Sequence, residues 1–111
     1  MKKNCKTKLY KPLPDYLSVG LSDIHGIGII AKDDIPAEVD MGISHVYDIN
    51  FQHNYIRTPL GGFINHSENA NCELIDDINS DYKKIKTIRK IIKGEELTLN
   101  YSMYDICNYL F

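Results

Sequence analysis

Short apolar runs, several of them interrupted by glycine or ended by proline, are the feature that most limits how this chain can fold. Residues 16–24 (YLSVGLSDI) alternate apolar with smaller or polar side chains, which is the period of a half-buried strand. Residues 25–36 (HGIGIIAKDDIP) and 38–49 (EVDMGISHVYDI) predict two further strands. Residues 83–92 carry isoleucines at spacings that a helix also allows, but their β-branched content favours a strand. With almost no convincing helix, the pattern predicts a compact all-β domain.

Three other stretches complete this pattern. Residues 50–62 contain a proline and paired glycines, which indicate irregular chain rather than a long helix. Residues 60–72 (LGGFINHSENANC) open like a strand and then crowd together an Asn-His-Ser triplet and further asparagines. Residues 93–105 (KGEELTLNYSMYD) predict a Lys-Gly turn and a strand on which Leu97 and Leu99 face one way. The concentration of polar groups in residues 60–72 marks that stretch as a candidate site.

Length and termini predict one intracellular domain. At 111 residues and 43% hydrophobic content, the chain corresponds to a single domain over residues 1–111. The first residues carry lysines like the start of a signal peptide, but no apolar segment follows and no run approaches membrane-spanning length. We therefore expect a cytoplasmic protein that is not secreted and does not bind a membrane.

Cysteines and histidines predict no metal site and no disulfide framework. The three cysteines, Cys5, Cys72 and Cys107, form no Cys-x-x-Cys pair and are odd in number, so we expect free thiols. His45 and His53 lack a neighbouring cysteine or another ligand signature, and neither is expected to bind a metal.

Charge is nearly balanced in total but uneven along the chain. The net charge is -2, yet ten of the fifteen acidic residues lie between Asp33 and Asp81, and basic residues cluster at the start and at 83–93. Solvated surface is the ordinary interpretation of such runs. The alternative is an acidic face that attracts a cationic partner. Direct nucleic-acid binding is not expected, because no basic patch is interleaved with aromatic residues.

Three ordered motifs resemble one family, the SET-domain protein lysine methyltransferases. HGIGIIAKDDIP resembles the family's first motif, FINHSENAN its Asn-His-Ser motif, and KGEELTLNY its closing motif. The match spans roughly residues 17–105. It divides the chain into a first motif (about 17–37), a short insert (about 38–61), the Asn-His-Ser motif (62–72), the closing motif (93–105) and a tail (106–111). It departs from the family pattern at Gly62, Glu68, Ala70 and Asn100, where the family usually has Arg, Cys, Pro and Asp.

The resemblance implies a fold and an activity. The fold would be a β-clip of several short sheets, in which the Asn-His-Ser segment crosses the closing tyrosine segment in a knot-like arrangement. The activity would be methyl transfer from S-adenosyl-L-methionine to a lysine of a protein substrate, a histone or another Lys-rich protein. The small size suits a virus or bacterium, so the expected location is the cytoplasm of a bacterium or of an infected host cell.

The same resemblance implies roles for individual residues. Tyr101 is the expected catalytic residue, which positions the methyl group and the amine. Cofactor contacts are expected at Gly26, Ile27, Gly28, Asn65, His66, Tyr101 and Tyr104. The candidates for the wall of the substrate lysine channel are Tyr47, Tyr55, Phe63, Tyr104 and Tyr109.

Other interpretations stay open at this stage. The chain can be a catalytically inactive SET-fold module that binds cofactor or a Lys-rich peptide, or a β-rich structural protein without a cofactor. A domain without flanking modules can also complete its substrate groove by forming a homodimer. Glu95 and Glu96 are adjacent on a predicted strand and point to opposite faces, so we assign them a structural or surface role rather than paired acid–base chemistry.

Overall fold

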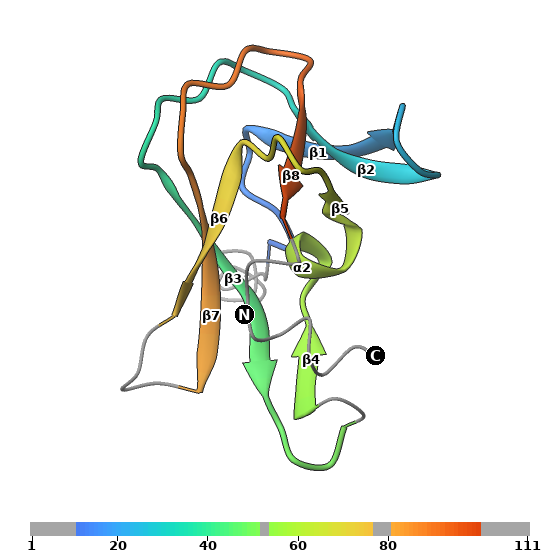
Figure 1. The fold of residues 1–111 in the computed structure, drawn as a ribbon, viewed down its shortest axis with the longest axis vertical. Helices are drawn as coiled ribbons and strands as arrows, with labels where there is room; N and C mark the ends of the chain where they lie inside the picture. Colours follow the sequence, from blue (N-terminus) through green and yellow to red (C-terminus); the bar gives the residue numbers. More distant parts are fainter. Residues whose placement is uncertain (1–10, 52–53, 77–80, 101–111) are drawn as a thin grey trace, which may run out of the picture.

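The computed structural model describes residues 11–51, 54–76 and 81–100, and within them the chain forms two four-stranded sheets (Figure 1). The first sheet has the order β1-β2-β8-β5 and consists of β1 (Leu17–Leu21), β2 (Ile27–Ala31), β8 (Glu96–Leu99) and β5 (Asn65–His66). The second has the order β4-β3-β7-β6 and consists of β4 (Tyr55–Arg57), β3 (Asp40–Tyr47), β7 (Tyr82–Thr87) and β6 (Cys72–Asp76). One short α-helix, α2 (Pro59–Phe63), lies among the described residues. The prediction of an all-β fold is confirmed.

The core lies where the two sheets meet. Ile29 on β2 and both Leu97 and Leu99 on β8 are completely buried from the first sheet, and Ile85 on β7 from the second. Thr98 is also buried, because both faces of β8 are covered. Leu97 and Leu99, which were predicted to face one way, are both buried, and Thr98 between them is buried too.

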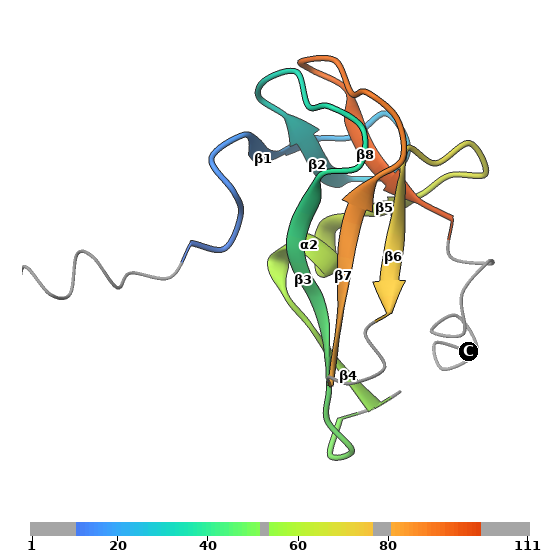
Figure 2. The same cartoon turned by 90° about the vertical axis from the view of Figure 1, so that its left-hand side faces the viewer.

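Helix α2 packs against β3 at one side of the core (Figure 2). Thr58 caps its first turn by accepting a hydrogen bond from the Gly61 N–H at 3.3 Å, and Pro59 follows at the first helical position, where its missing N–H costs nothing. Leu60 then enters the core at 2% exposure. The prediction that residues 60–72 open like a strand is wrong at this point, because the Thr-Pro cap starts a helical turn that ends only at Phe63.

Most predicted strands are confirmed and two were missed. β1, β2, β3 and β8 lie within the predicted runs, and β7 overlaps the run predicted over 83–92 but already ends at Thr87. Gly94, with φ +93°, forms the turn before β8. β4 lies in the stretch predicted to be irregular. β6 lies in a segment for which no strand was predicted, although its residues alternate between more and less buried positions. No helix among residues 11–51, 54–76 and 81–100 is long and apolar enough to cross a membrane.

Cys72 is a free, buried thiol on β6. Its Sγ donates to the Oδ1 of Asn71 at 3.3 Å, and burial raises its pKa to about 12. The thiol is therefore protonated and shielded in the folded protein.

Candidate functional site

The side-chain amide of Asn65 joins the three sequence motifs. Its Nδ2 lies 2.7 Å from Oε2 of Glu96 on β8 and 3.1 Å from Oγ of Ser22 in the loop between β1 and β2. The same Nδ2 also lies within hydrogen-bond distance of the carbonyl oxygens of His25, at 3.1 Å, and Ile27, at 3.2 Å. We refer to Ser22, Asn65 and Glu96 as the Ser-Asn-Glu cluster.

The hydroxyl of Ser22 connects this cluster to the turn of the first motif. Its Oγ donates to the carboxylate of Glu96, with distances of 2.7 and 2.8 Å to the two oxygens. It accepts hydrogen bonds from the backbone N–H groups of Ile24 at 2.9 Å and His25 at 3.1 Å. One hydroxyl therefore holds both the loop backbone and the carboxylate.

Strand order explains why residues so distant in the sequence meet. β8 pairs antiparallel with β2, where Glu96 lies opposite Ile30, and parallel with β5, where Asn65 lies opposite Thr98 (Figure 1). β8 therefore lies between the strand that follows the first motif's turn and the strand that begins the Asn-His-Ser motif. The predicted association of the Asn-His-Ser and closing segments is present in this parallel pairing, and the rest of the predicted crossing involves residues outside those described.

Gly28 is required by the packing of the cluster. A Cβ at this position would overlap the carboxylate of Glu96 and would lie 3.1 Å from Nδ2 of Asn65. The group that lies against Gly28 in the structure is the carboxylate of Glu96. Gly26 has a different role, because its φ of +50° lies in the left-handed region and closes the β1–β2 turn.

The cluster leaves one polar atom of Asn65 available. Both amide hydrogens are directed at protein acceptors, whereas Oδ1 accepts no hydrogen bond from any residue that the structure describes. Any ligand group that meets this side chain at Oδ1 would have to be a donor.

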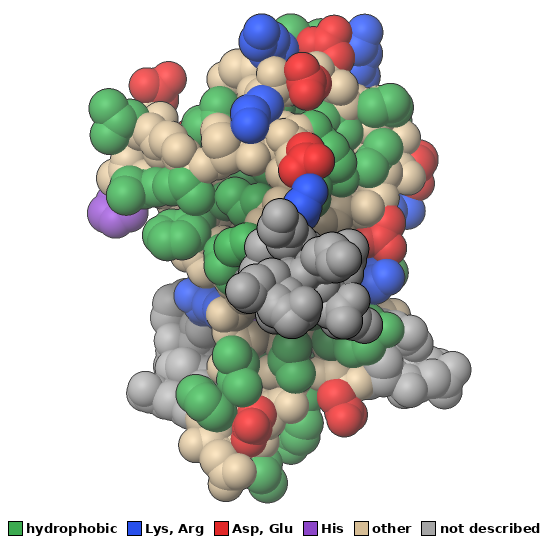
Figure 3. Space-filling view, turned by 180° about the vertical axis from the view of Figure 1, so that it is seen from behind, with side chains coloured by type: hydrophobic (Ala, Val, Ile, Leu, Met, Phe, Trp, Pro, Cys, Tyr) green, Lys and Arg blue, Asp and Glu red, His purple; other side chains and the backbone are tan. Residues whose placement is uncertain are grey.

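Apolar side chains surround the same turn. Figure 3 shows hydrophobic side chains gathered over the β1–β2 hairpin. Four of them are exposed: Val19, Leu21, Ile24 and Ile27, and the exposed fraction of Leu21 reaches 90%. The polar cluster thus lies beside an apolar surface, a combination that suits a ligand with both polar and apolar parts.

The other predicted site residues do not all gather at the cluster. His66 is exposed on β5, opposite Leu99, and Phe63, at the end of α2, is 41% exposed. Tyr101, Tyr104 and Tyr109 lie outside the described residues.

Tyr47 and Tyr55 pair with each other at the far end of the β3–β4 hairpin. Their ring centroids are 5.8 Å apart at 82°, and the ammonium of Lys83 lies 5.7 Å from the Tyr55 ring. Figure 1 shows this end of the hairpin away from β5 and β8. The structure therefore does not bring these two tyrosines to the Ser-Asn-Glu cluster.

Ser22 and Glu96 are the residues that sequence reasoning missed. Adjacent Glu95 and Glu96 do diverge as predicted: Glu95 accepts from Arg89 at 3.0 Å and from the Ile92 N–H at 2.6 Å, while Glu96 enters the cluster. A sequence signal existed in the serine four residues before Gly26, since serine hydroxyls commonly bond to nearby turn backbone. Nothing local indicated which of the two glutamates would face it.

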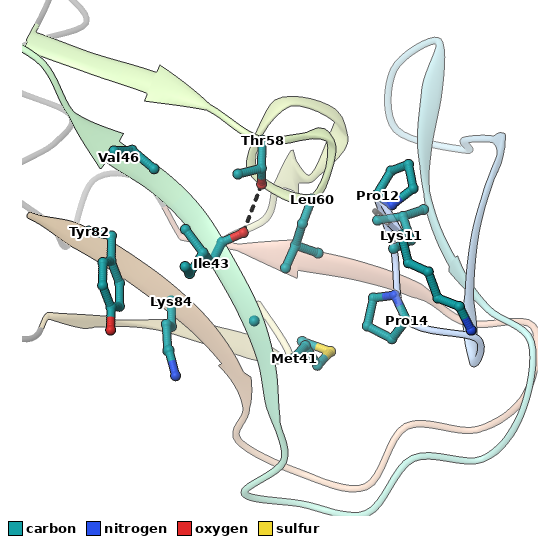
Figure 4. Close-up of a pocket in the computed structure, with 12 residues that line it drawn as sticks. Lys11, Pro12, Pro14, Met41, Ile43, Val46, Thr58, Leu60, Tyr82 and Lys84 are labelled. Atoms are coloured by element: carbon teal, nitrogen blue, oxygen red, sulfur yellow. Dashed lines mark hydrogen bonds between the residues drawn. The ribbon is translucent and has the colours of Figure 1, made fainter. Parts of the chain in front are cut away.

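The described part of the chain also has hollows on its surface. One of about 340 Å³ is lined by the β5–β6 loop, the start of β6, and the residues just after β7 and β8. It includes three of the family departures, Glu68, Ala70 and Asn100. A larger groove of about 610 Å³ lies between the N-terminal segment and β3 (Figure 4). Its wall is mostly apolar, with the Thr58 hydroxyl at one side donating to the Ile43 carbonyl at 2.8 Å. Within the described residues, no group of three His, Cys, Asp or Glu side chains could hold a metal ion.

Comparison with known proteins connects this geometry to one family. The family model described as "SET domain" matches residues 41–102. Two curated histone-lysine N-methyltransferases described as H3 lysine-36 specific, from two strains of Cryptococcus neoformans var. neoformans serotype D, are each 39% identical over 71 residues. That alignment covers 58% of this chain and 8% of each relative, so the chain spans less than a tenth of their length.

Solved structures share the fold at low sequence identity. A putative histone methyltransferase of Plasmodium falciparum has a TM-score of 0.62 at 20% identity, covering 79% of this chain and 94% of that one. The methyltransferase domain of human PR domain-containing protein 2 has a TM-score of 0.59 at 16% identity, covering 87% and 81%. A humanized mutant of the Chaetomium thermophilum Polycomb Repressive Complex 2 has a TM-score of 0.61 at 19% identity, covering 77% and 14%.

Proposed function

This chain belongs to the SET-domain family, and from that premise we propose that it transfers a methyl group from S-adenosyl-L-methionine to a lysine side chain of a protein. The observation that carries the proposal is the single cluster in which Asn65 joins the first motif to the closing motif. A ligand bound there would meet residues from all three motifs at once.

The residues at the cluster fit the chemistry of this cofactor. The cofactor supplies an activated methyl group on a sulfonium, and it carries an amino group that can donate hydrogen bonds. The Oδ1 of Asn65 is an acceptor without a partner among the described residues, and the carboxylate of Glu96 provides negative charge behind it. We propose that Gly26, Ile27, Gly28, Asn65 and His66 contact the cofactor.

The lysine substrate must lose a proton before it can react. A free lysine has a pKa of about 10.4, so roughly one side chain in a thousand is neutral near pH 7. A dry channel and a nearby cation both disfavour the ammonium form and lower this pKa. We propose that Tyr101, which follows β8 by two residues, orients the amine, and that orientation is the main catalytic contribution because no covalent intermediate has to form. Tyr104 is proposed to contact the cofactor and, with Phe63 and Tyr109, to line the lysine channel.

The proposed substrate class is supported by the charge of the sequence. The relatives' names specify lysine 36 of histone H3 for those proteins. For this chain we propose a Lys-rich protein, a histone among the candidates, because the acidic middle of the sequence would attract such a partner. That the chain forms a homodimer and that it is located in the cytoplasm remain predictions from the sequence.

The experiment that tests the proposal is a labelling assay. Purified protein is incubated with methyl-labelled S-adenosylmethionine and a mixture of Lys-rich proteins, with Tyr101→Phe and the matched control Tyr16→Phe in parallel. We expect label on lysine with the wild type and the control, and a loss of about 100-fold to 1,000-fold with Tyr101→Phe, as for deletion of a preorganised active-site donor. Wild-type turnover in Tyr101→Phe would refute the assigned mechanism.

A second candidate function is a module that binds but does not transfer. It is favoured by the departures Glu68, Ala70 and Asn100, which line one hollow beside β5 and β8 and change its charge and shape relative to the family pattern. In the same assay, this alternative predicts cofactor binding without label on any substrate.

A further inference from the structure

The carboxylate of Glu96 accepts hydrogen bonds from two side chains, those of Ser22 and Asn65. It receives the Ser22 hydroxyl at 2.7 and 2.8 Å and the Asn65 amide at 2.7 Å. Gly28 leaves the space that the carboxylate occupies, since a Cβ there would overlap it. The carboxylate is therefore built into the site, with its position set from three elements.

We infer that Glu96 and Ser22 are positioning residues that orient Asn65 and the first-motif turn to receive the amino-acid part of the cofactor. The inference rests on the proposed function and adds residues that the sequence motifs did not assign to the site. Neither residue has to touch the cofactor, because each acts through Asn65 or through the turn backbone.

The hydrogen-bond directions show how Glu96 acts through Asn65. With Nδ2 directed at Glu96, Ser22 and two carbonyl oxygens, the amide cannot rotate by half a turn without directing Oδ1 at a carboxylate. The negative charge on Glu96 also polarises the amide, which makes Oδ1 a stronger acceptor. Glu96 thus determines both the direction and the strength of the one acceptor that the cluster leaves open.

Ser22 fixes the backbone of the β1–β2 turn through hydrogen bonds. Its Oγ accepts from the N–H groups of Ile24 and His25, and the carbonyls of His25 and Ile27 lie against Asn65. The backbone on both sides of Gly26 is therefore tied to the cluster before any ligand binds.

Glu96→Gln is the sharpest test, because it keeps the size of the side chain while it removes the charge and replaces one acceptor oxygen by a donor. A glutamine presents an NH₂ group, a donor, to a site where Ser22 and Asn65 already present donors. Glu95→Gln is the matched control, since the adjacent carboxylate bonds to Arg89 and the Ile92 N–H instead of the cluster. Ser22→Ala and its control Ser18→Ala, on the same hairpin, provide a second pair.

The measurement is calorimetric titration of each protein with S-adenosylmethionine, together with melting temperature and steady-state kinetics. We expect Glu96→Gln and Ser22→Ala to weaken binding about 10-fold to 100-fold, as for loss of hydrogen bonds that orient a binding residue. The controls should bind within about twofold of wild type, and kcat at saturating cofactor should change much less than KM for the cofactor.

A purely structural role predicts a different result. The inference would be overturned if Glu95→Gln and Glu96→Gln lost cofactor affinity equally. It would also be overturned if kcat fell while cofactor affinity stayed unchanged. So would Glu96→Gln and Ser22→Ala variants that bind as wild type does. If wild type binds cofactor but the cluster variants bind equally well, only this inference fails. If wild type binds no cofactor at all, the proposed function fails and this inference with it.

A comparison of two ligands isolates the amino-acid part. S-adenosylhomocysteine carries the amino group, and 5′-methylthioadenosine lacks it. The affinity of Glu96→Gln for the first should fall about 10-fold or more, and its affinity for the second should stay within about twofold of wild type. If the affinity of Glu96→Gln fell equally for both ligands, Glu96 would not act by orienting Asn65 toward the amino group.

Discussion

Two adjacent glycines in α2 differ in the space around them: Gly61 is crowded and Gly62 is open. A Cβ at Gly61 would overlap the main-chain carbonyl oxygen of Ser44 and lie 2.9 Å from its carbon, whereas at Gly62 the nearest atom outside the helix is Cβ of Arg57 at 4.0 Å. Helix α2 can therefore approach β3 only because residue 61 has no side chain. The glycine that departs from the family pattern, Gly62, is exposed and leaves room for a larger residue.

Alanine at the two positions should change stability in opposite directions. Gly61→Ala forces α2 away from β3 and should lower the free energy of unfolding by about 1–3 kcal/mol or more. Gly62→Ala should raise it by up to about 1 kcal/mol, because alanine favours the helix over glycine. Urea unfolding of both variants checks this, and a destabilisation of equal size at both positions would contradict the packing described for Gly61.

At the scale of elements, the middle of the second sheet places a buried histidine between two cations. His45 on β3 lies opposite Arg57 on β4 and Lys83 on β7, is 4% exposed, and has its Nδ1 2.8 Å from the Ser44 hydroxyl. Burial first, and then Arg57 and Lys83, lower its pKa from 6.5 to about 4. The imidazole is therefore neutral at pH 7 and packs edge-on against the Tyr55 ring.

This histidine should make the protein less stable in mild acid. Below pH 6.5 the unfolded chain binds a proton that the folded chain does not bind until about pH 4, so stability present above pH 6.5 is lost as the pH falls between these values. The loss should be about 3 kcal/mol at most. Denaturant unfolding at pH 7 and pH 4.5 should show a smaller difference in His45→Gln than in wild type. An equal difference in both proteins would exclude His45 as its source.

At the scale of the whole molecule, the chain passes repeatedly from one sheet to the other. β1 and β2 belong to the first sheet, β3 and β4 to the second, β5 to the first, β6 and β7 to the second, and β8 to the first again. Neither sheet is made from one continuous piece of chain, and the buried strand β8 packs into the shared core. The two sheets should therefore unfold together rather than one after the other.

The buried thiol of Cys72 reports on this cooperativity. With Cys5→Ser and Cys107→Ser in place, Cys72 should not react with a thiol reagent in the native state, because it is 2% exposed and burial raises its pKa to about 12. In increasing urea, its labelling midpoint should coincide with the midpoint of the circular-dichroism transition. Labelling that begins at clearly lower urea would mean that the second sheet opens by itself.

Several elements could be predicted because their signals are local. Alternation in residues 16–24 and β-branching in 83–92 indicate strands whatever lies across from them, because side-chain direction in a strand repeats every second residue. The two strands that were missed, β4 and β6, are short or lie in polar stretches, and β4 is three residues long. The start of α2 had a local signal too, the Thr58-Pro59 cap, which the following glycines obscured.

By itself, the sequence determined the all-β class, the order of the three motifs and the place of Asn65 in the second of them, since each depends on residue type and spacing along the chain. The assignment of Tyr101 also depends on the motif alone. Only the tertiary structure decided that Glu96 and not Glu95 faces Asn65, that Ser22 joins them, and that Tyr47 and Tyr55 lie elsewhere. The reason is that these contacts depend on β8 lying between β2 and β5, and strand order in a sheet is a choice among distant partners that no local pattern encodes.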